Sequence, residues 1–218
     1  MRAAEFVDEL VSRRFEAVFN PYAERCPVHD RPDAPLIRRD NLRAFLAAAL
    51  DGGVDSVWIG RDLGYRGGRR TGLPLTDEAH LDALGATLGG ISFGRATVGP
   101  AVAERTAAIV WRMISRLGRP VFLWNVFPFH PHEPNDPLTN RSHTAAERRA
   151  CEYLIVALVE ALAPRRVVAV GGDAHKALTR LGFDCDYVRH PSYGGQSEFI
   201  EGVRHLYALP HEDVPILL

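Results

Sequence analysis

The sequence VDSVWIGRDLGYRGGRRTGLP, residues 54–74, decides the fold of this chain. Its first six residues form a mostly apolar run that predicts a strand. The run leads into a loop with five glycines and four arginines, and Asp62 lies just past the predicted strand end. In α/β proteins, ligands bind where a strand stops at such a loop, because helices cover both faces of the sheet and leave its carboxyl edge open. The segment therefore predicts a ligand site with Asp62 amid backbone N–H groups and positive charge.

Strand patterns and helix patterns alternate along the rest of the chain. Further apolar strands are expected at 121–126, 167–170 and 185–188. Helices are expected near the amino terminus and at 40–50, 101–117, 144–162, 173–181 and about 198–206, with Asp40, Thr144 and Asp173 as caps and with loops at 20–35 and 85–100. Because the strands mostly lack period-2 alternation, we expect a parallel sheet covered on both faces. The predicted fold is α/β: a single three-layer α/β/α domain over residues 1–218 with a central four-stranded parallel sheet.

Composition limits the classes of protein that fit. The chain has 218 residues, 46% apolar and 24% charged, and its net charge of −1 does not by itself indicate a nucleic-acid binder. Its three cysteines are widely spaced, which argues against a disulfide framework and for a reducing compartment. No apolar run approaches the roughly 20 residues that span a bilayer, and the first ten residues lack a signal-peptide core. We expect a cytoplasmic monomer with no membrane partner.

Three polar side chains lie at the ends of predicted strands. Asp62 follows the first strand, Asn125 ends the second, and His190 follows the fourth. Because the carboxyl ends of parallel strands share one edge of a sheet, these three residues are expected to converge.

The same positions carry a resemblance to a known family. The segments Gly60-Arg61-Asp62-Leu63-Gly64 and Arg70-Thr71-Gly72-Leu73-Pro74 resemble the two parts of the first motif of the uracil-DNA glycosylase superfamily. His190-Pro191-Ser192 resembles its second motif, Asn125 stands where the family reads the pyrimidine, and residues 135–144 resemble the loop that follows in the iron-sulfur branches. The resemblance spans roughly residues 55–205, in the expected order.

The resemblance implies an enzyme that flips uracil out of DNA and hydrolyses its N-glycosidic bond. It implies catalytic roles for Asp62 and His190, and pairing of the Asn125 amide with O4 and N3–H of uracil. The other expected base contacts are Gly60, Arg61, Leu63, Gly64, Tyr65 and Leu75. The expected DNA contacts are Arg69, Arg70, Ser192, Tyr193 and Gly194.

The chain departs from the family pattern at several positions. Leu63, Gly64 and Tyr65 replace the proline and tyrosine that follow the acid in the best-known branch, and Leu75 stands where an aromatic ring often stacks on the base. The stacking ring could instead be Tyr65, Phe127 or another aromatic side chain. Three widely spaced cysteines cannot supply the four ligands of an iron-sulfur cluster, so no cofactor is expected. The histidines at 130, 132 and 143, and Cys26 with His29, match no zinc template, so no metal is expected.

Other interpretations stay open on the sequence alone. Asp62 could cap the following turn, Asn125 and His190 could have structural roles, and the arginine loop could simply be solvated. A non-catalytic reader of damaged or abasic DNA would use the same pocket. A third interpretation is an α/β hydrolase of small nucleotides or nucleosides.

Overall fold

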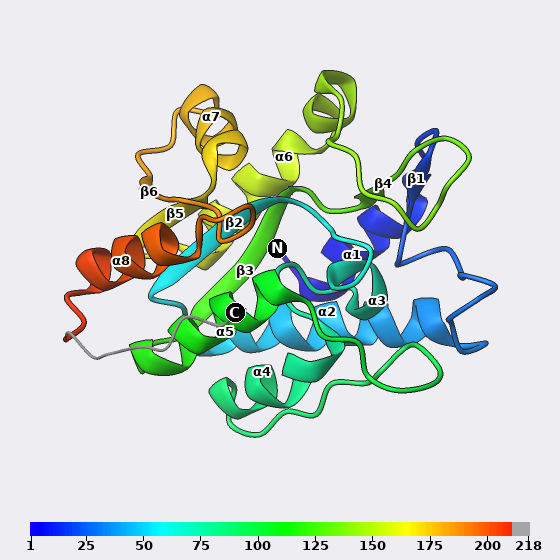
Figure 1. The fold of residues 1–218 in the computed structure, drawn as a ribbon, viewed down its shortest axis with the longest axis horizontal. Helices are drawn as coiled ribbons and strands as arrows, with labels where there is room; N and C mark the ends of the chain where they lie inside the picture. Colours follow the sequence, from blue (N-terminus) through cyan, green and yellow to red (C-terminus); the bar gives the residue numbers. More distant parts are fainter. Residues whose placement is uncertain (211–218) are drawn as a thin grey trace.

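A four-stranded parallel sheet forms the centre of the protein (Figure 1). The computed structural model describes residues 1–210, and residues 211–218 of the predicted domain lie outside this part. The strand order is β3 (Val121–Phe127), β2 (Ser56–Asp62), β5 (Arg166–Val170) and β6 (Asp186–Val188), and each neighbouring pair is parallel. The predicted α/β architecture and its four parallel strands are confirmed.

Helices cover both faces of this sheet. On one face, α8 (Gln196–Tyr207) packs Phe199 against Trp58 of β2, and α5 (Arg105–Leu117) packs against α8. On the other face, α2 (Ala34–Gly52) stacks Phe45 on Phe122 of β3. Trp58 lies in register with Leu123, the neighbour of Phe122, and adjacent residues of a strand point to opposite faces. The two sets of helices therefore lie on opposite sides of the sheet.

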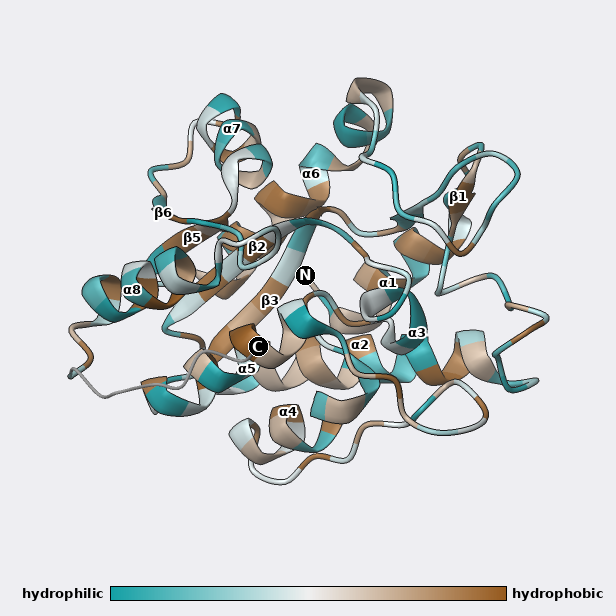
Figure 2. Ribbon diagram, viewed as in Figure 1, coloured by the Kyte–Doolittle hydropathy of each residue, from teal (hydrophilic) through white to brown (hydrophobic). Residues whose placement is uncertain are grey.

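The remaining helices complete these layers. Close to α2 lie α1 (Ala3–Ser12) and α6 (Ala145–Leu162), while α7 (Gly172–Arg180) packs on β5 and β2. Figure 2 shows the apolar residues gathered on the strands and on helix faces that turn towards them. Short elements fill the connections: β1 (Val18–Phe19) pairs with β4 (His130–Pro131), and α3 (Gly68–Thr71), the 3-10 helix η1 (Glu78–His80) and α4 (Leu81–Thr87) follow β2.

Several predicted boundaries shift for local reasons. Strand β2 runs on to Asp62, so this residue ends the strand instead of following it. Helix α2 begins six residues before Asp40, with Pro35 in its first turn, so Asp40 lies inside the helix and does not cap it. Asp173 likewise lies in the first turn of α7, which is preceded by Gly171. The capping box of Thr144 and Glu147 at the start of α6 is confirmed.

Within residues 1–210, no helix combines the length and the apolar character needed to cross a membrane.

Candidate active site

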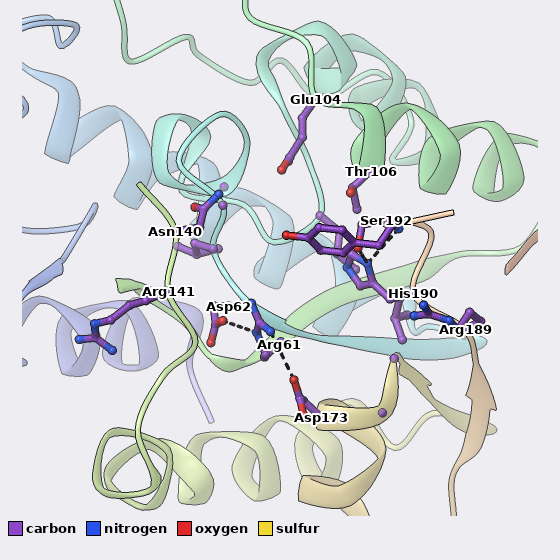
Figure 3. A pocket seen from close by; sticks show the side chains of 18 residues that line it. Arg61, Asp62, Glu104, Thr106, Asn140, Arg141, Asp173, Arg189, His190 and Ser192 are labelled. Carbon is purple, nitrogen blue, oxygen red and sulfur yellow. Dashed lines mark hydrogen bonds and ion pairs between the residues drawn. The ribbon is translucent and has the colours of Figure 1, made fainter. Parts of the chain in front are cut away.

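A cavity of about 340 Å³ opens at the carboxyl edge of the sheet (Figure 3). Its walls come from the loops after β2, β5 and β6, the start of α5 and the segment before α6. Asp62 and His190 both line it, as predicted from the strand ends. Six of the other expected contacts also line it: Arg61, Leu63, Gly64, Leu75, Ser192 and Tyr193.

The Asp62 carboxylate is held at both of its oxygens. Arg61 Nε donates to Oδ2 at 2.5 Å, and the ring Nδ1 of His143 lies within hydrogen-bond distance of Oδ1. Only 6% of the Asp62 side chain is exposed. Arg61 is itself held by Asp173, with Nη1 3.3 Å from Oδ2. These contacts fix the orientation of the carboxylate at the edge of the cavity.

Sequence reasoning missed His143 as a partner of Asp62 and considered it only as a metal ligand. The residue lies in the loop that returns from β3 to α6, directly before the Thr144 cap. Because β3 is the neighbour of β2, this loop passes the carboxyl end of β2. The capping box at Thr144 was the signal that could have placed His143 at the same sheet edge. Asn140 of this loop also lines the cavity, and its Oδ1 accepts the Tyr65 N–H at 3.0 Å.

His190 is arranged as a neutral hydrogen-bond donor. Its Nδ1 accepts the backbone N–H of Ser192 at 3.2 Å and lies 2.7 Å from Ser192 Oγ, which leaves the proton on Nε2. Burial lowers the pKa of His190 to about 4, and the positive charges of Arg61 and Arg189 act in the same direction. The backbone of Gly171 approaches closely, since a Cβ at this position would lie 3.0 Å from the Cβ of His190.

Asn125 lies beside the cavity and does not line it. It is fully buried, and neither atom of its amide has a hydrogen-bond partner within residues 1–210. It is in register with Gly60, where an added Cβ would stand 2.6 Å from Asn125 Oδ1 and 3.3 Å from Leu75 Cδ2. Leu75, whose φ is +53°, does line the cavity. The Leu75 side chain and the unpaired amide of Asn125 therefore both lie next to Gly60.

Two predicted DNA contacts are inside the protein. Arg69 and Arg70 are 2% and 6% exposed. Arg70 Nε donates to Glu78 Oε2 at 2.9 Å, and the guanidinium carbon of Arg69 lies 4.0 Å from the ring centroid of Phe19. Their burial is at odds with contacts to DNA phosphates. Both side chains instead hold the glycine-rich loop against the body of the protein.

The two rings named as stacking candidates do not line the cavity. Tyr65 is half-buried, with Arg66 over its ring, and Phe127 is fully buried against Phe15 and His143. Tyr193 is different: it is 98% exposed at the rim, with φ of +50° and with Gly194 next to it in the same exposed turn. The exposed ring at this site is thus on the loop after β6.

Of the histidines that raised the question of a metal, His130 and His132 have ring centroids 5.8 Å apart, whereas His143 contacts Asp62. His130 is fully buried, its Nε2 lies 2.8 Å from the Thr139 carbonyl oxygen, and burial lowers its pKa to about 3. In the described part of the chain, no three His, Cys, Asp or Glu side chains gather as a metal would require.

The arrangement has a definite chemical capacity. A fixed carboxylate stabilises positive charge that develops beside it, and a neutral imidazole N–H stabilises negative charge that develops on an oxygen. Asp62 and His190 both line the cavity, and in the view of Figure 3 Arg61 lies between them.

Comparisons with known proteins agree with the predicted fold and family. The sequence model of the Uracil DNA glycosylase superfamily matches residues 51–212. A crystal structure of wild-type SMUG2 from Pedobacter heparinus is similar in fold, with a TM-score of 0.63 and 17% sequence identity. The match covers 96% of this chain and 98% of that chain. No curated protein sequence matches the chain.

Proposed function

The chain belongs to the uracil DNA glycosylase superfamily, and from this premise we propose that it removes uracil from DNA and leaves an abasic site. Membership makes it a DNA glycosylase of base excision repair, and uracil as the substrate is our proposal. One observation supports it above the others: Asp62 and His190 line a single cavity, beside the buried and unpaired amide of Asn125.

Asp62 serves the sugar. When the bond between C1′ and N1 breaks, its electron pair leaves with the base and positive charge builds on the sugar. The Asp62 carboxylate stabilises that charge and orients a water, which adds to C1′ and passes a proton to the carboxylate; the uracil anion takes up a proton after it leaves. Arg61 and His143 keep the carboxylate in place, so little reorganisation accompanies the step.

His190 serves the leaving base. Its Nε2–H donates to O2 of the departing uracil, where negative charge accumulates. A pKa of about 4 keeps the ring neutral at physiological pH. A neutral imidazole stabilises the anion by a hydrogen bond. It is a weaker acid than the charged imidazolium and does not protonate the base before the bond breaks.

Asn125 reads the base. Its amide can donate to O4 and accept from N3–H, a pair that cytosine presents in reverse. Asn125 is fully buried and does not line the cavity, so side chains beside it must move when the base enters; Leu75, which lines the cavity next to Gly60, is the first candidate.

Cations near the cavity, of which Lys176 and Arg180 are exposed and Arg148 is half-buried, replace Arg69 and Arg70 as proposed phosphate contacts. A second hollow of about 210 Å³ adjoins His143 and is lined by Arg148, Lys176 and Arg180. We expect Lys176→Ala to weaken duplex binding. The slope of log K against log salt concentration should fall in magnitude by about one, as for the loss of one phosphate contact. Binding with an unchanged salt dependence would remove this hollow from the DNA path.

The test is Asp62→Asn in a single-turnover assay on a labelled oligonucleotide that contains one uracil. We expect uracil release to fall by about 1,000-fold, since one charge about 4 Å away at an effective dielectric of 20 contributes about 4 kcal/mol. Asp184→Asn, at an exposed position before β6, is the matched control. Release at the wild-type rate by Asp62→Asn would refute the proposed role.

One observation favours a second function. The Asn125 amide is fully buried and does not line the cavity in this conformation, as would be expected of a protein that only holds damaged or abasic DNA. Tight binding of abasic DNA by the wild-type protein, with no release of any base, would select this non-catalytic reader.

A further inference from the structure

Lys176 is the only lysine of this chain, and it lines the hollow that adjoins His143. The remaining 25 of its 26 Lys and Arg residues are arginines. Arginine binds phosphate as well as lysine does, so a need for positive charge alone does not explain a lysine at this position. Lysine differs from arginine in having a primary amine that can lose its proton and attack a carbonyl carbon. The choice of residue therefore indicates the chemistry of an amine.

The amine of Lys176 has no partner in the described part of the chain. The two other long cations of the hollow, Arg148 and Arg180, place Nε at 2.9 and 3.6 Å from Glu152 Oε1. Lys176 is exposed and makes no ion pair or hydrogen bond within residues 1–210. Its side chain is therefore free to turn towards a molecule that enters the hollow.

The hollow shares a wall with the cavity that holds Asp62. Arg61 and Asp173 line both of them, and Figure 3 shows Arg61 bonded to Asp62 and to Asp173. Lys176 lies three residues after Asp173 on α7. Residues three apart share one face of a helix, with about 5–6 Å between their Cβ atoms. A sugar that lies against Asp62 therefore has the amine of Lys176 beyond Arg61, on the side of α7.

We propose that Lys176 attacks the aldehyde of an abasic sugar, and that this chain cleaves the DNA strand at the site from which it has removed the base. This second activity goes beyond the proposed function and rests on it only for the supply of abasic sites. An abasic deoxyribose opens when the proton of its C1′ hydroxyl passes to O4′, and C1′ then carries an aldehyde. The open sugar is flexible, so its C1′ can leave Asp62 and reach the neighbouring hollow.

The bonds balance with water as the only co-reactant. The free amine of Lys176 adds to C1′ and a water leaves, which forms an imine. The protonated imine makes the C2′ hydrogen acidic. Water takes this proton, its electron pair forms the C2′–C3′ double bond, and the 3′ phosphate leaves with the electrons of the C3′–O bond. Hydrolysis of the imine then returns the amine and leaves an unsaturated aldehyde on one strand end and a phosphate on the other.

The same hollow suits the leaving phosphate. Arg148 and Arg180 line it beside Lys176, and charge-assisted hydrogen bonds from guanidinium groups stabilise a phosphate that gains negative charge. The amine and the groups that would receive the leaving phosphate thus lie on neighbouring helices, α6 and α7.

The experiment starts from a duplex with a preformed abasic site, so it does not depend on uracil release. Sodium borohydride reduces an imine to a stable amine and thereby fixes the protein to the DNA. We expect the wild-type protein to be trapped, with the sugar on the peptide that contains Lys176, and to nick the strand when borohydride is absent. Lys176→Arg keeps the positive charge but lacks the amine, and should give less than about a tenth of the trapped product at saturating DNA.

The matched control moves the lysine to the other edge of the sheet. Arg165 is exposed and lies directly before β5, at the edge opposite the cavity. The double variant Lys176→Arg with Arg165→Lys therefore has the composition of the wild-type protein, and it should be trapped no more than Lys176→Arg alone.

The outcomes separate this inference from the proposed function. Wild-type trapping by Lys176→Arg, restored trapping in the double variant, or a sugar on the terminal α-amino group overturns the role of Lys176. Uracil release by a wild-type protein that neither becomes trapped on abasic DNA nor nicks it overturns this inference and leaves the proposed function intact. Trapping at Lys176 without any release of uracil overturns the proposed function and supports the role of Lys176.

Discussion

At acid pH this protein should lose less free energy of unfolding than its two buried histidines alone would cause, because Glu104 offsets part of the loss. The Glu104→Gln variant should lose the full amount. His190 and His130 have pKa values lowered from 6.5 to about 4 and about 3. As pH falls below 6.5, these two histidines bind protons in the unfolded chain but not in the folded chain, so the free energy of unfolding decreases. Glu104 affects stability at acid pH in the opposite direction. Burial raises its pKa from 4.5 to about 7, so the folded chain gains a proton first and stability rises between pH 7 and 4.5.

The magnitudes separate the wild-type protein from the variant. Each pH unit between the folded and unfolded pKa values changes the free energy of unfolding by about 1.4 kcal/mol per group. Between pH 7.5 and 5 the two histidines together remove about 4 kcal/mol, and protonation of Glu104 returns about 2 kcal/mol. The wild-type protein should therefore lose about 2 kcal/mol and Glu104→Gln about 4 kcal/mol. Carboxyl groups with lowered pKa values, such as Glu147, act below 4.5 and lie outside this window.

Urea unfolding at pH 7.5, 6.5 and 5, followed by tryptophan fluorescence, measures these changes. Glu160→Gln, exposed on α6, is the matched control and should follow the wild-type curve. Equal acid losses in wild type and Glu104→Gln would refute the reasoning, since Glu104 would then titrate alike in both states.

Three further predictions concern activity and DNA. His143→Leu removes a hydrogen-bond partner of Asp62 and should lower kcat by about 10- to 100-fold with little change in KM. Single-turnover rates at saturating enzyme measure the loss in the rate of base release. An unchanged rate would mean that the contact between His143 and Asp62 does not contribute to catalysis. Gly60→Ala places a Cβ 2.6 Å from Asn125 Oδ1 and should raise KM for uracil DNA without loss of circular dichroism; an unchanged KM would mean that the amide is not the base reader. Tyr193→Ala removes a ring that is 98% exposed and should change the free energy of unfolding by less than about 0.5 kcal/mol. It should weaken duplex binding about tenfold, measured by fluorescence anisotropy, and unchanged affinity would rule out stacking by this ring.

The part of the site that follows from parallel strands was predictable from the sequence. Apolar runs located the strands, and their alternation with helices implied a shared edge, so Asp62 and His190 were expected at one cavity. Asn125 was expected there too. The sequence carries no sign that Asn125 would be fully buried and would not line the cavity.

Contacts made by loops were not predictable, because loops have no periodicity. His143 reaches Asp62 only because the segment after β3 passes the end of β2. Arg69 and Arg70 show a second limit. Basic residues in a glycine-rich loop suggest a phosphate site, but partners from the following segment, Glu78 and Thr97, draw Arg70 inside. A pattern of charge does not state which charges are buried.

The unpaired amide of Asn125 also sets a limit on how stable the free protein can be. A buried donor or acceptor without a partner costs about 1–3 kcal/mol, and this side chain has one of each. A base that bonds to both atoms would offset this cost on binding, so occupation of the pocket should raise the melting temperature. A substitution at position 125 that stabilises the empty protein should weaken its hold on the base. At this one residue, a gain in thermal stability of the empty protein is expected to come with a loss of affinity for the base.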